Sequence, residues 1–291
     1  MREEVLESYL EAGKIASRIL SRSLPLVRPG ASFLDVVEAV EGSVRSEGAG
    51  LAFPLNLSLN EAAAHDTASD RDDRVFAAGD VAKMDLGVHL DGYIADTAGT
   101  VDLGDHGPLV RASRAALEKA ISLVKPGVST GELGQAIRGE IEALGFRPVA
   151  NLTGHGLGRY EIHTPPTVPN VGITGGAVLR EGTVFAIEPF ATTGSGFVSD
   201  GPRVQIFQQI AERPARLPAA KRVLDQVRDR HGLPFARRWL SGEKLELTLA
   251  SLVRSGHLHA YPVLRDVPGS LVSQAEHTVI VTGDGCIVTT R

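Results

Sequence analysis

Only one cysteine, Cys286, occurs in the 291 residues, so the chain cannot form an internal disulfide. A lone cysteine fits a reducing compartment. No apolar run reaches the roughly 18 residues needed to cross a bilayer. The charged N-terminal segment also lacks the uninterrupted apolar core of a secretion signal. These absences predict a cytoplasmic protein without a membrane partner.

An excess of charge of one sign is also missing. The 30 Lys and Arg residues stand against 35 Asp and Glu residues, which gives a formal net charge of −5. That balance is too mild to indicate nucleic acid or an anionic membrane as the main partner. Apolar residues make up 43% of the chain, enough for a full core in one large domain or in two small ones.

The most informative stretch lies between residues 81 and 101. Two apolar, β-prone segments, 81–88 and 93–101, flank an Asp-Gly pair, a pattern typical of a β-hairpin. Asp85 and Asp96 then lie opposite or diagonal across the strands, roughly 5–8 Å apart at Cβ. Opposed like charges are destabilising, and a divalent cation is a direct counter-charge. A single Asp solvated at a strand edge is the alternative, and the hairpin alone does not decide.

The first part of the chain reads as helices followed by a strand. Residues 51–60 alternate apolar with polar and predict a strand, which residues 61–65 extend toward a polar loop, 66–74. Ser32 is placed to cap a helix. Helical spacing and flanking Pro or Gly residues predict helices over 1–23, 33–46, 108–124 and 130–144.

Two segments of the sequence repeat one another. Residues 27–48 and 124–145 share the frame V-[RK]-P-G-x-S, a helix and a closing glycine. Each copy follows a helix and precedes a strand. The repeat predicts a pseudo-twofold α/β domain with its site between the two halves.

The second half contains a segment of different character. Residues 183–187 predict a strand, and β character returns at residues 273–289. Between them, from about residue 211 to 258, the chain is polar and helical in pattern. Within 212–238, eight basic residues stand against three acidic ones. This segment has the features of an insertion.

Three further residues suit the chemistry of the hairpin acids. His155 lies between glycines, in a loop that leaves its imidazole unobstructed. Glu188 and Glu276 each lie at the edge of an apolar strand, where a carboxylate is costly unless it is paired or coordinated. Either glutamate alone is also explained as a solvated strand end. Together with Asp85 and Asp96 they form an oxygen-rich set suited to two divalent ions.

The local contexts of these five residues, MDLG, ADTA, GHGLG, IEPF and AEHT, closely resemble the methionine aminopeptidases of the pita-bread fold over essentially the whole chain. The segments FPLNLSLNEAAAH (53–65) and GHGLGRYEIHTPPTVPNV (154–171), with a long insertion between the two glutamates, resemble the type 2 branch. The short N-terminus resembles its archaeal form. Asp66 and Ala68 depart from the residues common in the family, which affects the rim of the site.

The resemblance implies an α+β, pseudo-twofold pita-bread fold, a curved antiparallel sheet covered by helices. It places the catalytic domain at residues 1–194 and 267–291, with a helical insertion subdomain at 195–266. The activity implied is metal-dependent removal of the N-terminal methionine from nascent proteins and peptides, by attack of a hydroxide held between two metals on the first peptide bond.

The same resemblance assigns the site residues. Asp85 binds one metal, Asp96 and Glu276 bridge both, and His155 with Glu188 completes the second site. The two divalent ions are Co, Mn, Fe or Zn, since oxygen ligands with one imidazole accept any of them. Other assigned roles are general base for Glu188, donors to the substrate for His65 and His163, and an apolar methionine pocket at Phe53, Pro54, Asn56, Ile162 and His163, with Tyr261 or Phe207 as additions.

Several alternatives stay open from the sequence. Phe53 and Ile162 also suit a plain hydrophobic core. An X-Pro aminopeptidase or prolidase uses a similar metal set, but such enzymes usually carry an additional N-terminal domain. A binding module that has lost its metals is a third reading. The basic stretch 213–238 suggests contact with ribosomal phosphates, although a solvated helical face explains it too. We expect a monomer.

Overall fold

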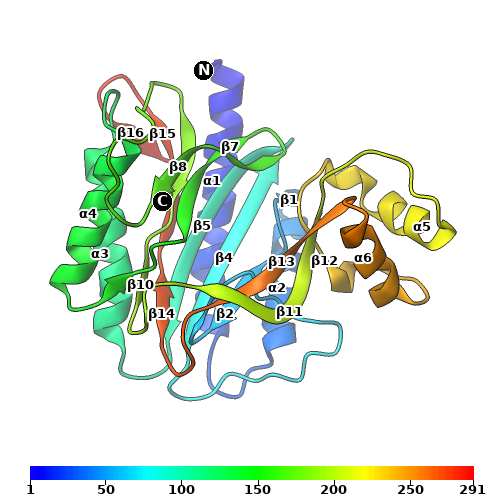
Figure 1. The fold of residues 1–291 in the computed structure, drawn as a ribbon. Helices are drawn as coiled ribbons and strands as arrows, with labels where there is room; N and C mark the ends of the chain where they lie inside the picture. Colours follow the sequence, from blue (N-terminus) through cyan, green and yellow to red (C-terminus); the bar gives the residue numbers. More distant parts are fainter.

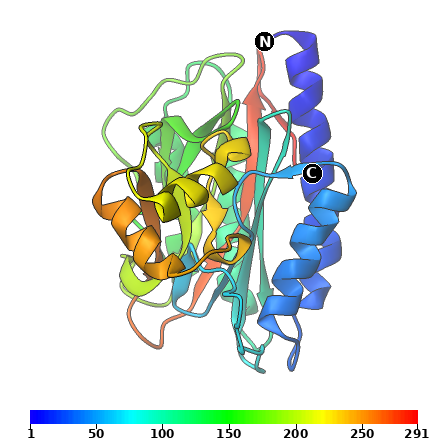
Figure 2. The same ribbon diagram turned by 90° about the vertical axis from the view of Figure 1, so that its right-hand side faces the viewer.

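The computed structural model describes all 291 residues. A curved nine-stranded sheet forms the centre of the molecule, and its strands follow the order β1-β4-β5-β15-β9-β7-β8, with β2 beside β4 and β16 beside β15. Helices α1 and α2 cover one face of the sheet, and a segment rich in short helices lies on the other side (Figures 1 and 2). The predicted α+β class is therefore confirmed.

The helices have well-defined bounds. None of them is both long and apolar enough to cross a membrane. The α-helices are α1 (Glu3–Ser23), α2 (Phe33–Ser46), α3 (Gly107–Leu123), α4 (Thr130–Ala143), α5 (Pro218–Gln226) and α6 (Leu245–Arg254), and the 3-10 turns are η1 (Leu24–Leu26), η2 (Arg228–Arg230) and η3 (Arg237–Trp239).

The strands form one large and two smaller sheets. The strands of the large sheet are β1 (Gly50–Leu51), β2 (Asn56–Leu59), β4 (Val81–Leu90), β5 (Tyr93–Asp102), β7 (Thr153–Gly158), β8 (Glu161–Pro169), β9 (Val184–Ile187), β15 (Glu276–Val281) and β16 (Cys286–Val288). The smaller sheets contain β3 (Ala62–Ala64), β11 (Ser199–Gln209), β12 (Phe235–Ala236) and β13 (Leu258–Arg265), and β6 (Arg147–Pro148), β10 (Phe190–Thr192) and β14 (Val272–Gln274).

The predicted hairpin is β4 and β5. Asp85 pairs with Ala98 and Gly87 pairs with Asp96, so the two aspartates lie diagonally on one face of the hairpin. The intervening Leu86 points to the opposite face and is fully buried in the core that α1 and α2 complete. Alternation along the strand thus holds the acids on the face away from the helices.

The internal repeat corresponds to two similar halves. In the first, Ser32 caps α2 and bridges to Val75; in the second, Ser129 caps α4 and bridges to Val178. Each half also has its own core, one of 22 buried residues and one of 18. These matched contacts confirm the pseudo-twofold arrangement. The two halves join where β15 lies between β5 and β9.

Two local predictions are wrong. The single strand expected over 51–65 is divided into β1, β2 and β3: the irregular residues 52–55 separate β1 from β2, and a turn at Asn60, which is left-handed with φ of 53°, separates β2 from β3. The Gly-rich segment around His155 is strand β7 instead of a loop. Glycine there permits close packing: a Cβ at Gly154 would lie 2.3 Å from the carbonyl oxygen of Ala186.

The segment between Glu188 and Glu276 is only partly helical. It contains α5 and α6, but also β11, β12 and β13, which form a sheet with β3. A separate core of 11 buried residues holds it together. β13 pairs with β3 at Leu264 and Ala64, so this segment is joined by hydrogen bonds to the chain just before His65. The boundaries 195 and 266 of an inserted subdomain stay a prediction.

Candidate metal centre

A cavity of about 500 Å³ opens between the large sheet and the strands β11 and β13. Leu152, Ile206 and Pro234 form part of its wall. Most of the residues that the sequence singles out line it: Asp85, Asp96, His155, Glu188, Glu276, His65, His163, Phe53, Asn56, Ile162 and Tyr261. Pro54 and Phe207 do not, and Phe207 instead packs against Phe235 in the core of the inserted segment.

Five neighbouring strands supply the chemistry of this cavity. Asp85 lies on β4, Asp96 on β5, Glu276 on β15 and His155 on β7, while Glu188 directly follows β9. These strands are consecutive in the sheet, in the order β4-β5-β15-β9-β7. Residues distant in sequence are therefore brought to one face of one sheet.

The donor atoms lie close together. Nε2 of His155 is 3.4 Å from Oε1 of Glu188 and 3.7 Å from Oδ2 of Asp96. Donor atoms of Asp96, His155 and Glu276 all lie within 4.8 Å of one another. Such spacing places several ligand atoms around a single small volume, as a bound cation requires.

The carboxylates repel one another, and no cationic side chain neutralises them. Burial raises the pKa of Asp85 to about 7, and burial together with the charge of Asp85 raises the pKa of Asp96. Burial and the neighbouring aspartates raise the pKa values of Glu188 and Glu276 in the same direction. No Lys or Arg forms an ion pair with any of the four. The nearest lysine in sequence, Lys83, donates instead to the carbonyl oxygen of Asn60 at 2.8 Å.

These features fit a divalent cation. Oδ1 of Asp85 and Oδ1 of Asp96 are buried and have no hydrogen-bond partner. Buried polar atoms are normally satisfied, and these two oxygens, which face the same cavity, can be satisfied by coordinating a cation. Four carboxylates and one imidazole form a donor set that suits divalent ions of the first transition row, and the set does not select among them.

The histidines of the cavity are neutral. Burial, with a contribution from His163, lowers the pKa of His155 to about 3, and burial lowers that of His65 to about 4. His155 has its Nδ1 3.4 Å from the carbonyl oxygen of Gly156, which leaves Nε2 facing the acids. The rings of His155 and His163 meet edge to face at 4.6 Å, and His65 lies 5.1 Å from Tyr261.

Gln274 is a residue of the site that sequence reasoning missed. Its amide nitrogen lies 3.3 Å from Oδ2 of Asp85 and 3.4 Å from Oε2 of Glu276, and it is almost fully buried. The sequence did contain a signal, because Gln274 precedes Glu276 by two positions and thus shares its face of an extended chain. Two buried carboxylates are oriented by this one amide.

Phe53 and Ile162 are at once part of the hydrophobic core and part of the cavity wall. Phe53 lies so close to the hairpin that a Cβ at Gly87 would be 2.2 Å from its Cε1. The apolar wall therefore reaches the strand that carries Asp85.

The fold and the donor set agree with comparisons against known proteins. Residues 7–282 match the model of metallopeptidase family M24. The chain is a member of family M24. Its pita-bread fold, a mixed α+β arrangement of curved antiparallel sheet and helices, is the one predicted. As an M24 metallopeptidase the protein is a hydrolase, and its cluster of acids and histidine is a candidate site for divalent metal.

Relatives of this M24 peptidase share its full length. It is 46% identical to a methionine aminopeptidase of Archaeoglobus fulgidus, with complete coverage of both chains. It is 47% identical to a methionine aminopeptidase of Pyrococcus horikoshii, over 98% of this chain and 99% of the relative. A crystal structure of the Thermotoga maritima methionine aminopeptidase superposes with a TM-score of 0.73 at 26% identity, covering 100% of this chain and 98% of that one.

Proposed function

We propose that this protein is a methionine aminopeptidase, which removes the N-terminal methionine from peptides and nascent proteins in a metal-dependent hydrolysis. The observation that carries the proposal is the convergence of four carboxylates and one imidazole, each on or directly after one of five consecutive strands, on a cavity with an apolar wall. Full-length identity to methionine aminopeptidases supports the same substrate class.

The proposed ligand assignment follows the geometry. Asp85, Asp96, His155, Glu188 and Glu276 would together hold the divalent ions, and the short distances from His155 to Asp96 and Glu188 support His155 as a member of this set. Two divalent ions held there would supply Lewis-acid polarisation of the first peptide carbonyl and a lowered pKa for an attacking water. The side-chain amide of Gln274 orients the carboxylates of Asp85 and Glu276 by hydrogen bonds.

Glu188 is the proposed general base. It lies at the cavity wall directly after β9, where a carboxylate can take a proton from the attacking water and pass it to the leaving amine. Burial lowers the pKa of both His65 and His163, which favours the neutral imidazole, and a neutral imidazole presents one N–H group. Hydrogen bonds from these groups to the scissile carbonyl would stabilise charge that develops on its oxygen.

Selectivity for methionine is proposed to come from Phe53 and Ile162, with Asn56 and His163 beside them. An apolar pocket discriminates by shape and dispersion, worth about 1–3 kcal/mol per methylene. That range is sufficient to favour a long, unbranched side chain over larger or β-branched ones.

Three finer assignments belong to the same proposal. We assign the chain to the type 2 branch, which the folded segment between Glu188 and Glu276 supports. We place the protein in the cytoplasm because a single cysteine fits a reducing compartment. We expect a monomer, which sedimentation or light scattering in solution would test.

A ribosome contact through 213–238 is proposed for the outward-facing basic residues alone. Arg237 pairs with Asp70 and Glu246, and Arg238 is buried against Glu41, so neither is free for an external phosphate. Exposed basic residues without an ion pair remain at Arg213, Arg216, Lys221 and Arg222, whereas Arg228 pairs with Asp225. Ribosome co-sedimentation that is unchanged by charge reversal at Lys221 and Arg222 would exclude the contact.

The direct experiment compares two peptides. Protein stripped with EDTA is assayed with and without added Co or Mn on Met-Ala-Ser and on an Ala-Pro peptide. Metal-dependent release of methionine alone supports the proposal. Cleavage of only the X-Pro peptide would indicate a different M24 specificity, and no cleavage with no bound metal would indicate a binding module.

A further inference from the structure

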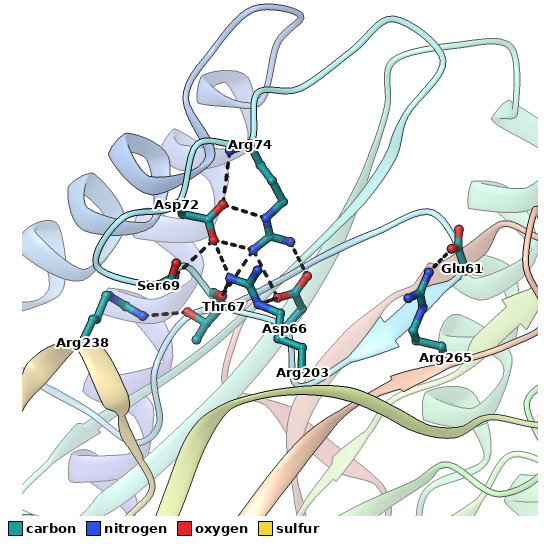
Figure 3. A network of polar contacts seen from close by, with 9 residues as sticks. All are labelled: Glu61, Asp66, Thr67, Ser69, Asp72, Arg74, Arg203, Arg238 and Arg265. Atoms are coloured by element: carbon teal, nitrogen blue, oxygen red, sulfur yellow. Dashed lines mark hydrogen bonds and ion pairs between the residues drawn. The ribbon is translucent and has the colours of Figure 1, made fainter. Parts of the chain in front are cut away.

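A cluster of ion pairs joins the loop 66–74, which directly follows His65, to strand β11 (Figure 3). Asp66 accepts a hydrogen bond from Arg74 Nη1 at 2.6 Å, and its carboxylate lies 3.5 Å from Arg203 Nε. Asp72 accepts from Arg74 Nε at 2.8 Å and from Arg203 Nη2 at 2.5 Å. Both carboxylates are almost fully buried, so their charges are balanced by these two arginines.

The arginines that hold this loop come from a distant part of the chain. Arg203, on β11, also donates to the carbonyl oxygen of Thr67 at 3.2 Å. Arg238 donates to Thr67 Oγ1 at 2.9 Å and to the carbonyl oxygen of Ala68 at 3.0 Å. The three residues that directly follow His65 are therefore anchored by the segment between Glu188 and Glu276. This gives the unusual Asp66 of the sequence a structural role.

His65 depends on such anchoring. Its backbone is left-handed, with φ of 63°, a conformation that residues with side chains rarely adopt. A strained backbone persists only where its surroundings over-determine it. The Nδ1 atom of the imidazole is buried and has no hydrogen-bond partner. The chain before His65 is the three-residue strand β3, which pairs with β13, and the chain after it is held at Asp66 by the arginines and by a backbone hydrogen bond from Leu57 N.

The strand that carries Arg203 also forms part of the cavity wall. Ile206, three residues later on β11, lines the cavity together with His65. Tyr261, on the paired strand β13, packs against the His65 ring and is the register partner of Ile206. The guanidinium of Arg203 thus connects two parts of the molecule. One is the loop backbone that orients His65, and the other is strand β11, which forms part of the cavity wall that His65 faces.

We propose that Arg203 is a positioning residue for His65, acting through the carboxylates of Asp66 and Asp72. The proposal rests on the proposed aminopeptidase function and adds a residue from outside the metal centre to it. Loss of the guanidinium removes the contacts that join loop 66–74 to β11 and so loosens the backbone that orients the imidazole. Misplacement of such a donor by about 1 Å lowers the rate of reaction by up to about 100-fold.

The test compares Arg203→Met with a matched variant, Arg265→Met. Arg265 pairs with Glu61, four residues before His65, at an exposed position on the neighbouring strand (Figure 3). With the metal-loaded protein and Met-Ala-Ser, Arg203→Met is expected to lower kcat about 10- to 100-fold and to change KM far less. Arg265→Met is expected to match the unmodified protein. Arg203→Lys should have a higher kcat than Arg203→Met, because the lysine ammonium keeps the positive charge but lacks the planar set of N–H donors of a guanidinium.

A double-mutant cycle separates positioning from general loss of structure. In a His65→Ala background, Arg203→Met should cause no further loss of kcat. Asp66→Asn, which is nearly isosteric, should reproduce the effect of Arg203→Met and should not add to it. Losses that multiply in the His65→Ala background, equal losses in Arg265→Met, or an unchanged kcat in Arg203→Met would each overturn the proposal.

A second readout does not depend on activity. NMR of 15N-histidine-labelled protein reports the His65 ring, which His65→Ala assigns by its missing signal. The His65 signal is expected to shift or broaden in Arg203→Met and to be unchanged in Arg265→Met, at a temperature where both remain folded. An unchanged His65 signal in Arg203→Met would contradict the positioning role. If the unmodified protein releases no methionine, the proposed function fails, and this comparison still decides the role of Arg203.

Discussion

At the scale of single residues, the metal centre is a set of buried acids held together against their own repulsion. Burial raises the pKa values of Asp85, Asp96, Glu188 and Glu276, and the charges of neighbouring carboxylates raise those of the last three further. A cation relieves both, so metal binding should release protons and stabilise the fold.

The acid at position 85 makes this testable through pH. In the folded protein the pKa of Asp85 is about 7, above the ~3.9 of an Asp in the unfolded chain. The protonated carboxyl therefore makes its full contribution to the stability of the fold below pH ~3.9, and this contribution is lost as the pH rises through 7. Asp85→Asn cannot ionise. In EDTA, its Tm should exceed that of the unmodified protein at pH 8 by on the order of 2–5 °C.

Differential scanning fluorimetry at pH 5 and pH 8 checks this expectation. The difference in Tm should shrink at pH 5, where the Asp85 of the unmodified protein is mostly protonated. A difference in Tm that is equal at both pH values would show that the charge of Asp85 is not what destabilises the metal-free protein.

His155 and His163 form a second residue-scale comparison, because their rings touch but their proposed roles differ. His155→Ala removes a proposed ligand and should weaken Mn binding by about tenfold or more. His163→Ala should keep its Mn stoichiometry but lower kcat by about 100- to 1000-fold. Calorimetric Mn titration and steady-state kinetics on both variants check this. Equal loss of metal in both would show that His163 also binds the cation.

At the scale of elements, the hairpin of β4 and β5 brings the metal centre and the apolar pocket together. Asp85 and Gly87 lie on one face, and Phe53 packs over Gly87. Phe53 can approach the strand this closely only because residue 87 has no side chain.

Gly87→Ala tests this contact. The new Cβ would lie 2.2 Å from Phe53 Cε1, so the ring must move into the cavity. We expect kcat/KM on Met-Ala-Ser to fall by about 10- to 200-fold, mostly through KM. Gly42→Ala in α2 is the control, because its Cβ meets no atom within 4 Å; it should leave kinetics unchanged and stabilise the helix by about 0.5–1 kcal/mol. Normal kinetics in Gly87→Ala would mean that Phe53 does not shape the pocket.

The elements also show what the sequence can and cannot predict. The hairpin was predictable because alternation and an Asp-Gly turn are local signals. The division of 51–65 into three strands was not, because the alternation of apolar and polar residues shows neither the irregular residues 52–55 nor the left-handed turn at Asn60. The roles of Gln274 and Arg203 were not predicted for another reason. Each acts through contacts with residues that are far away in sequence, and a local sequence pattern does not show such contacts.

At the scale of the whole molecule, two repeated halves build the sheet, and the segment between Glu188 and Glu276 closes the cavity. The repeat was visible in the sequence, since both copies keep the same turn and cap. The strands β11 and β13 were not, because the basic, polar composition of this segment favoured an all-helical prediction. Its pairing with β3 makes it a wall of the site.

The central claim is that this assembly hydrolyses the first peptide bond of Met-initiated chains only when metal is bound. The most direct measurement is methionine release from Met-Ala-Ser during titration of Mn into EDTA-stripped protein. We predict no release without metal and a rise that saturates with bound Mn. Full methionine release by the stripped protein, or none at saturating Mn, Co, Fe and Zn, would contradict the account.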